Sequence, residues 1–109
     1  MTTAVLGLTR DTFDETIKGS DLPVVIEFWT AWCPPCKTIA PALEAIATEQ
    51  VQRVRIFKVN VDEHPELAAR YEVMSIPTVL VFKGGDLVGR MVGARGRSRL
   101  LEEIDTLIR

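Results

Sequence analysis

The chain has 109 residues, a length that suits one domain with one hydrophobic core and leaves too little apolar surface for two. Hydrophobic residues make up 47% of it and charged residues 26%, which excludes an intrinsically disordered chain. The net charge of -2 excludes a strongly basic nucleic-acid-binding protein. We therefore expect a single domain over residues 1–109.

The N-terminal residues 1–7 contain no basic segment and no apolar stretch long enough for a secretory leader. No apolar run approaches the roughly 20 residues of a membrane span. Arginines are densest at Arg90, Arg95, Arg97 and Arg99, a pattern typical of a solvated face near a helix start. We predict a cytoplasmic protein whose partners include neither a membrane nor a nucleic acid.

The first half of the chain alternates between helical and strand-like segments. Apolar residues at helical spacing predict a helix that ends near Gly19: Leu8, Phe13 and Ile17. A short strand over residues 4–6 precedes it. Residues 22–29 form a nearly continuous apolar run, which is typical of a strand buried on both faces. Apolar spacing then predicts a helix over residues 34–50, kinked at Pro41.

The second half begins with a buried strand predicted over residues 54–61 and a short helix from Pro65. Two further strands, residues 78–82 and 86–92, are joined by a Gly-Gly pair that suits a tight hairpin. Ser98 is the predicted N-cap of a last helix. The apolar face of that helix comprises Leu100, Leu101, Ile104, Leu107 and Ile108.

This order of elements determines the expected fold class. Strand–helix–strand units imply parallel pairing, whereas the hairpin adds an antiparallel pair. We predict an α/β fold with a central mixed β-sheet and helices on both faces.

The two cysteines, Cys33 and Cys36, stand three residues apart. A small secreted domain that is held by disulfides contains more cysteines at wider spacing. A bridge across so short a loop stabilises a fold least in the loop-entropy picture. Reactivity or metal binding is therefore favoured over a structural role.

Residues 32–37, Trp-Cys-Pro-Pro-Cys-Lys, follow a buried strand and begin a predicted helix. The positive end of the helix dipole and its unpaired N–H groups favour a thiolate, which is the nucleophile. We expect Cys33, the more exposed of the two at the helix end, to attack a substrate disulfide. Cys36 then attacks the mixed disulfide and releases the reduced substrate. Pro34 and Pro35 lack N–H groups, so the N–H of Cys36 is the expected backbone donor to the sulfur of Cys33.

A zinc site requires four ligands, and the soft donors of the chain are Cys33, Cys36 and His64. His64 follows a different predicted strand. A metal or cluster that bridges two chains and a pair of inert buried thiols are alternatives that the motif favours less than redox chemistry. We predict no metal and no cofactor other than a redox-active Cys33–Cys36 disulfide.

Several motifs closely resemble the thioredoxin family: residues 28–37 (Phe-Trp-Thr-Ala-Trp-Cys-Pro-Pro-Cys-Lys), 39–41 (Ile-Ala-Pro) and 75–78 (Ser-Ile-Pro-Thr). The resemblance continues through residues 82–85 and 92–94, and so covers nearly the whole chain in order. It implies the thioredoxin fold and thiol–disulfide exchange. The chain departs from the family at Pro34, where thioredoxins usually have Gly.

The resemblance also implies roles for residues outside the Cys motif. Pro77 corresponds to the family's cis-proline, which faces the two cysteines. Ile76 would offer backbone hydrogen bonds to an extended substrate segment. The implied substrate groove is shallow and apolar, and comprises Trp32, Pro34, Pro35, Ile76, Pro77, Gly93 and Ala94.

Glu27 stands where the family typically buries an Asp. A charge in a doubly buried strand is costly, so we expect a raised pKa and proton transfer with Cys36. Lys58 matches the family's buried lysine, and we expect it to pair with Glu27.

The resemblance implies a general protein-disulfide reductant that acts on disulfide-bearing proteins as a monomer. A thioredoxin-reductase-like flavoenzyme would recharge it. Two alternatives use the same chain differently. In one, the same chemistry serves a dedicated partner such as a peroxidase or reductase. In the other, the fold is a binding module within a larger assembly and its thiols are dispensable.

Overall fold

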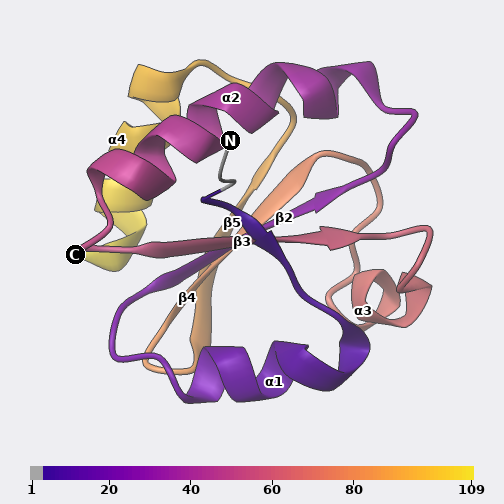
Figure 1. Cartoon of the computed structure of the whole chain (residues 1–109), viewed down its shortest axis with the longest axis horizontal. Helices are drawn as coiled ribbons and strands as arrows, with labels where there is room; N and C mark the ends of the chain where they lie inside the picture. The colour runs from indigo at the N-terminus through magenta and orange to yellow at the C-terminus, as the bar shows by residue number, and fades with distance from the viewer. Residues whose placement is uncertain (1–3) are drawn as a thin grey trace.

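The computed structural model describes residues 4–109 (Figure 1). The strands are β1 (Leu6–Gly7), β2 (Val24–Trp29), β3 (Arg55–Asn60), β4 (Thr78–Lys83) and β5 (Asp86–Val92). The helices are α1 (Arg10–Lys18), α2 (Pro34–Glu49), α3 (Pro65–Arg70) and α4 (Arg97–Ile108). Between residues 4 and 109, no helix combines the length and apolar character that crossing a membrane requires.

The strands form one sheet in the order β1-β3-β2-β4-β5. β3 runs parallel to both β1 and β2, whereas β4 is antiparallel to β2 and β5. Helices α1 and α3 lie on one face of the sheet, and α2 and α4 on the other (Figure 1). The predicted α/β fold class, with a mixed sheet between helices, is confirmed.

Alternation along β2 divides the interior into two cores. Val24, Ile26 and Phe28 pack with side chains of α1 and α3. Val25 points the other way and packs with side chains of α2 and α4. Because successive side chains of a strand point to opposite faces, Glu27 shares the α2/α4 face with Val25. The sequence of β2 thus buries a carboxyl group beneath α2.

Two helix starts differ from the prediction. α1 begins at Arg10 rather than at Leu8, because Thr9 caps it: the Thr12 N–H donates to Thr9 Oγ1 at 3.3 Å, and the Thr9 N–H to Thr12 Oγ1 at 2.9 Å. The prediction that Ser98 caps the last helix is wrong. α4 begins at Arg97 after the N-cap Gly96, so Ser98 lies in its first turn.

The start of α4 follows from what the helix buries. The N–H of Leu100 donates to the carbonyl of Gly96 at 3.0 Å, and Leu100 and Ile104 are fully buried under the sheet. Burial of two such side chains contributes about 3–6 kcal/mol, whereas a good N-cap side chain contributes about 1 kcal/mol. The short N-terminal strand is also displaced: it covers residues 6–7 instead of 4–6.

Candidate active site

The two cysteines lie where β2 ends and α2 begins. Cys33 is the N-cap of α2, and Pro34 and Pro35 are its first two residues, where a missing N–H removes no helical hydrogen bond. Cys33 and Cys36 form a disulfide with their Cα atoms 5.3 Å apart. The local sequence therefore places two sulfur atoms at the positive end of a helix.

The expected difference in exposure between the cysteines is absent in this oxidised state. Each of the two disulfide-bonded residues is only 3% exposed. The expectation that Cys33 is the more exposed of the two is therefore wrong for the disulfide form.

One backbone hydrogen bond distinguishes the two sulfur atoms. The N–H of Cys36 donates to Cys33 Sγ at 3.2 Å, as the sequence predicted. Pro34 and Pro35 carry no N–H, so this donor is the first that α2 offers to the sulfur. A thiolate on Cys33 would gain both this hydrogen bond and the helix dipole, whereas Cys36 lies one turn inside the helix.

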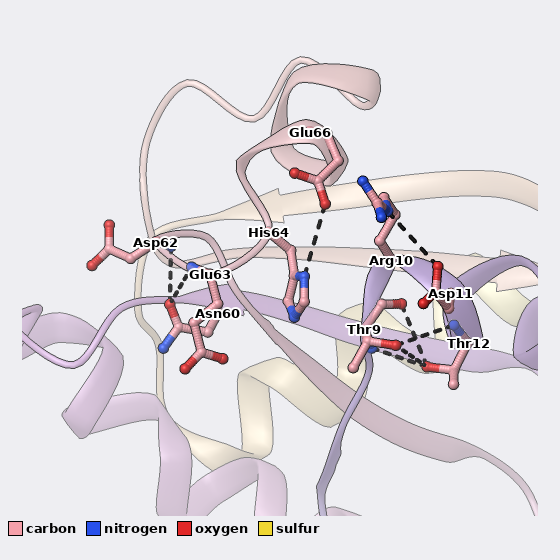
Figure 2. A network of polar contacts seen from close by, with 9 residues as sticks. All are labelled: Thr9, Arg10, Asp11, Thr12, Asn60, Asp62, Glu63, His64 and Glu66. Carbon is pink, nitrogen blue, oxygen red and sulfur yellow. Dashed lines mark hydrogen bonds and ion pairs between the residues drawn. The ribbon is translucent and has the colours of Figure 1, made fainter.

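Trp32 is 68% exposed directly before Cys33. Its indole N–H donates to Asp62 Oδ2 at 2.9 Å, across 30 residues of sequence. Asn60 shapes the loop that holds Asp62, because its side-chain oxygen accepts the N–H groups of Asp62 and Glu63 (Figure 2). Sequence reasoning missed this support. The signal was an Asn two residues before an Asp at the end of a strand, the pattern of an Asx turn.

Strand register brings three loops to one end of the sheet. β2 ends there and leads to the cysteines, while Thr78 at the start of β4 pairs with both Phe28 and Val92. The Ile76–Pro77 peptide bond immediately before Thr78 is cis, as the resemblance implied. Gly93, which follows Val92, has a φ of 93° and donates its N–H to the carbonyl of Pro77 at 2.8 Å. Residues expected in the substrate groove therefore come from loops at the same end of the sheet.

Glu27 is 3% exposed and lies opposite Lys58 on β3 and Val79 on β4. Burial raises the pKa of Glu27 to about 7, although the nearby Lys58 ammonium acts to lower it. At neutral pH this carboxyl group therefore exists in both protonation states. A group with such a pKa can both accept and return a proton near pH 7.

The expected contact ion pair between Lys58 and Glu27 is not among the ion pairs that residues 4–109 form. Lys58 Nζ lies 5.2 Å from the centre of the Trp29 ring, so its charge is directed over the face of the indole. Lys58 thus acts on Glu27 through its electric field at longer range.

A cavity of about 130 Å³ connects these groups with Cys36. It is lined by Glu27, Trp29, Thr30, Ala31, Cys36, Lys37, Ala40 and Lys58. The carboxyl group and Cys36 therefore border one space, which is the geometry that proton exchange between them requires. Sequence reasoning did not identify Thr30, whose position directly after a buried strand was the available signal.

His64 takes no part in this arrangement. It precedes α3, and its Nδ1 lies 3.8 Å from Glu66 Oε1 (Figure 2). Within the described part of the chain, no cluster of three or more His, Cys, Asp and Glu side chains could hold a metal ion.

The fold and site define a class of protein: an α/β domain with a disulfide at the start of a helix and a buried carboxyl group beneath it. The thioredoxin family model matches residues 4–106. The chain is 42% identical to a thioredoxin of Mycobacterium tuberculosis over 105 residues, or 96% of this chain and 90% of that protein. It is 48% identical to a thioredoxin of Streptomyces clavuligerus over 94 residues, or 86% and 87% of the two chains. The chain belongs to the thioredoxin family.

Membership of this family, together with the disulfide-forming cysteine pair, makes the chain a protein thiol–disulfide oxidoreductase. A further relative is a bifunctional thioredoxin reductase/thioredoxin of Mycobacterium leprae, 42% identical over 101 residues. That match covers 93% of this chain and 22% of the bifunctional protein.

Proposed function

We propose that this chain is a general protein-disulfide reductant. The observation that carries the proposal is the hydrogen bond from the Cys36 N–H to Cys33 Sγ at the N-terminus of α2, because it favours a thiolate on Cys33. The Cys33 thiolate attacks a substrate disulfide, and one substrate thiolate leaves. Cys36 then attacks Cys33 Sγ in the mixed disulfide, which closes the Cys33–Cys36 bond and releases the second substrate thiolate.

We assign the proton transfer of the second step to Glu27. Cys36 must lose its thiol proton to attack, and the Glu27 carboxylate borders the same cavity. A pKa of about 7 supports this role, since the group is partly ionised at neutral pH. Lys58 tunes this carboxyl group through its charge.

We propose that substrates bind as extended segments across an apolar surface beside Cys33. Backbone groups of Ile76 bond to the segment, and the surface comprises Trp32, Pro34, Pro35, Ile76, Pro77, Gly93 and Ala94. The exposure of Trp32 and its fixed orientation on Asp62 support the proposal. A surface of this kind selects for unfolded or mobile disulfide-bearing segments rather than for one partner.

The remaining features follow from this activity. We propose a thioredoxin-reductase-like flavoenzyme as the source of electrons, which the bifunctional relative supports because its name joins the two activities in one chain.

The redox-active disulfide is the only cofactor proposed, and residues 1–109 act as a monomeric domain in the cytoplasm. We propose no nucleic-acid partner, because the net charge of -2 provides no basic excess.

Reduction of insulin disulfides tests the proposal, with dithiothreitol as the electron source so that no reductase is needed. We expect the native chain to reduce insulin rapidly and Cys33→Ser to fall to the rate of dithiothreitol alone. Cys36→Ser is the matched variant: once dithiothreitol has been removed, it should react once and, in a cell lysate, remain as mixed disulfides with many different proteins. Equal rates for the native chain and Cys33→Ser would contradict the proposal. Capture of one partner only, with slow insulin reduction, would replace the general reductant by a dedicated one.

A further inference from the structure

Three buried polar atoms around the cavity beside Cys36 have no hydrogen-bond partner within residues 4–109: Glu27 Oε2, Trp29 Nε1 and Thr30 Oγ1. Thr30 is only 1% exposed, so its hydroxyl cannot turn to bulk solvent. Buried polar groups in native proteins are nearly always paired, with protein or with ordered water. The cavity of about 130 Å³ has room for such water molecules.

The charges that border this cavity come from three elements. Glu27 lies on β2, Lys58 on β3, and Lys37 on α2 together with the Cys36 sulfur. On β4, the residue opposite Glu27 is the apolar Val79, so that strand adds no titratable group at this point. Within residues 4–109, Glu27 is therefore the one acidic group that lines the cavity.

The lining side chains differ in what they can offer to water. Lysine and the tryptophan indole only donate hydrogen bonds, and an ionised carboxylate only accepts them. A threonine hydroxyl does both at once. Apart from the reacting thiol of Cys36, Thr30 is thus the one lining side chain within residues 4–109 that can donate and accept a hydrogen bond at the same time, whatever the protonation state of Glu27.

We propose that Thr30 is a positioning residue for proton transfer: its hydroxyl orients water in this cavity between the Glu27 carboxylate and the sulfur of Cys36. The inference rests on the proposed function, since it concerns the step in which Cys36 attacks the mixed disulfide. In that step the Cys36 thiol proton passes to water, and a proton of that water passes to Glu27. The Cys36 sulfur bonds to Cys33 Sγ, and the electron pair of the broken disulfide leaves with the substrate thiolate. Solvent then protonates that thiolate.

Titration of the oxidised full-length chain tests the inference without any substrate. Trp29 borders the cavity, so its fluorescence should report ionisation of Glu27, and the transition should vanish in Glu27→Gln. In Thr30→Val the carboxylate loses hydrogen-bonded water, so the pKa of Glu27 should rise by at least about half a unit. Thr30→Ser restores the hydroxyl and should leave the pKa within about 0.2 units of its native value.

Two results would overturn the inference. One is a Thr30→Val titration that coincides with the native curve. The other is an equal shift in Thr30→Val and Thr30→Ser, because packing alone would then explain it. Thr30→Ala serves as the second hydroxyl-free variant if Thr30→Val does not fold, and the same outcomes apply to it.

The pH dependence of insulin reduction separates a role of Thr30 in positioning water from a general loss of structure. In Thr30→Val, the pH at which insulin reduction reaches half its maximal rate should rise together with the pKa of Glu27, while the maximal rate at high pH is retained. An equal fractional loss of rate at every pH would contradict the inference. If Cys33→Ser reduced insulin as fast as the native chain, the proposed function would be refuted. The fluorescence titration of the Thr30 variants does not depend on that result.

Discussion

The two faces of the sheet are built from the same strands, yet they differ in how they are packed. The α1/α3 face is closed by aromatic contacts: Phe13 lies with its ring centre 6.4 Å from Phe28 and 6.1 Å from Phe82, and Tyr71 lies 5.6 Å from Phe82. The α2/α4 face is aliphatic over most of its area, but beneath the start of α2 it contains a carboxyl group and a cavity.

The difference shows where this fold is stabilised and where it is destabilised. Phe28 and Glu27 are neighbours on β2. Phe28 completes a packed core, whereas Glu27 is buried with one oxygen that no group of residues 4–109 hydrogen-bonds. Burial of a carboxyl group opposes folding when the group is charged. The stability supplied on the α1/α3 face thus allows a reactive, unfavourable arrangement on the other face.

The largest expected effect comes from breaking the aromatic face. Phe13→Ala removes a fully buried ring that contacts three other aromatic rings, so the free energy of unfolding should fall by about 3–5 kcal/mol. Urea unfolding followed by circular dichroism measures this loss. The exposed Val51→Ala is the control and should change stability by less than about 0.5 kcal/mol. A loss below about 1 kcal/mol for Phe13→Ala would show that this face is not the stabilising one.

The second-largest expected effect is a gain in the free energy of unfolding when Glu27 is replaced, and the size of this gain depends on pH. Glu27 has a pKa of about 7 in the folded protein, against an ordinary value of 4.5. Between these values the folded protein binds more protons than the unfolded chain, so the free energy of unfolding falls as pH rises. The total loss is up to about 3 kcal/mol, and it is complete just above pH 7.

Glu27→Gln removes this loss. Relative to the native chain, the oxidised variant should gain up to about 3 kcal/mol of stability between pH 4 and pH 8. Urea unfolding at four pH values across this range gives the difference. Glu102→Gln, the same change on an exposed side of α4, should leave the pH dependence as it is. If the free energy of unfolding depended on pH in the same way for the native chain and for Glu27→Gln, the buried Glu27 carboxylate would not be the group that destabilises the fold.

The smallest effect concerns the backbone at the edge of the aromatic face. Glu72, just after α3, has a φ of 54°, and left-handed backbone costs a residue with a side chain about 1–2 kcal/mol. Arg90 holds this turn by donating to the carbonyl of Tyr71 at 2.8 Å. Glu72→Gly should raise the free energy of unfolding by up to about 1 kcal/mol, measured by urea unfolding.

Glu72→Ala separates the backbone from the charge. It removes the carboxylate but retains the strained φ, so it should show none of the gain. If Glu72→Ala stabilises the chain as much as Glu72→Gly does, the gain comes from the charge and not from the backbone.

Much of the fold and the reactive centre could be predicted because their signals are local. The apolar run before Cys33 predicts a buried strand, and the Cys-Pro-Pro-Cys spacing places both sulfur atoms in the first turn of a helix. The end of α1 at Gly19 follows from the same kind of signal and is confirmed.

Features that depend on distant contacts could not be predicted. Trp32 donates a hydrogen bond to Asp62 across 30 residues, and the Lys58 ammonium lies over the ring of Trp29. Thr30 becomes notable only once the cavity around it is known. The N-cap of α4 was wrong because a local preference for Ser98 is smaller than the gain from burying Leu100 and Ile104.

The two edges of the sheet have a consequence for the protein at high concentration. One edge is β1, which is only two residues long, and at the other edge the pairing of β5 with β4 shifts register between Val81 and Phe82. A short edge and an irregular one give a foreign strand few evenly spaced hydrogen-bonding groups. The sheet thus gives a second copy of the chain little opportunity to pair edge to edge.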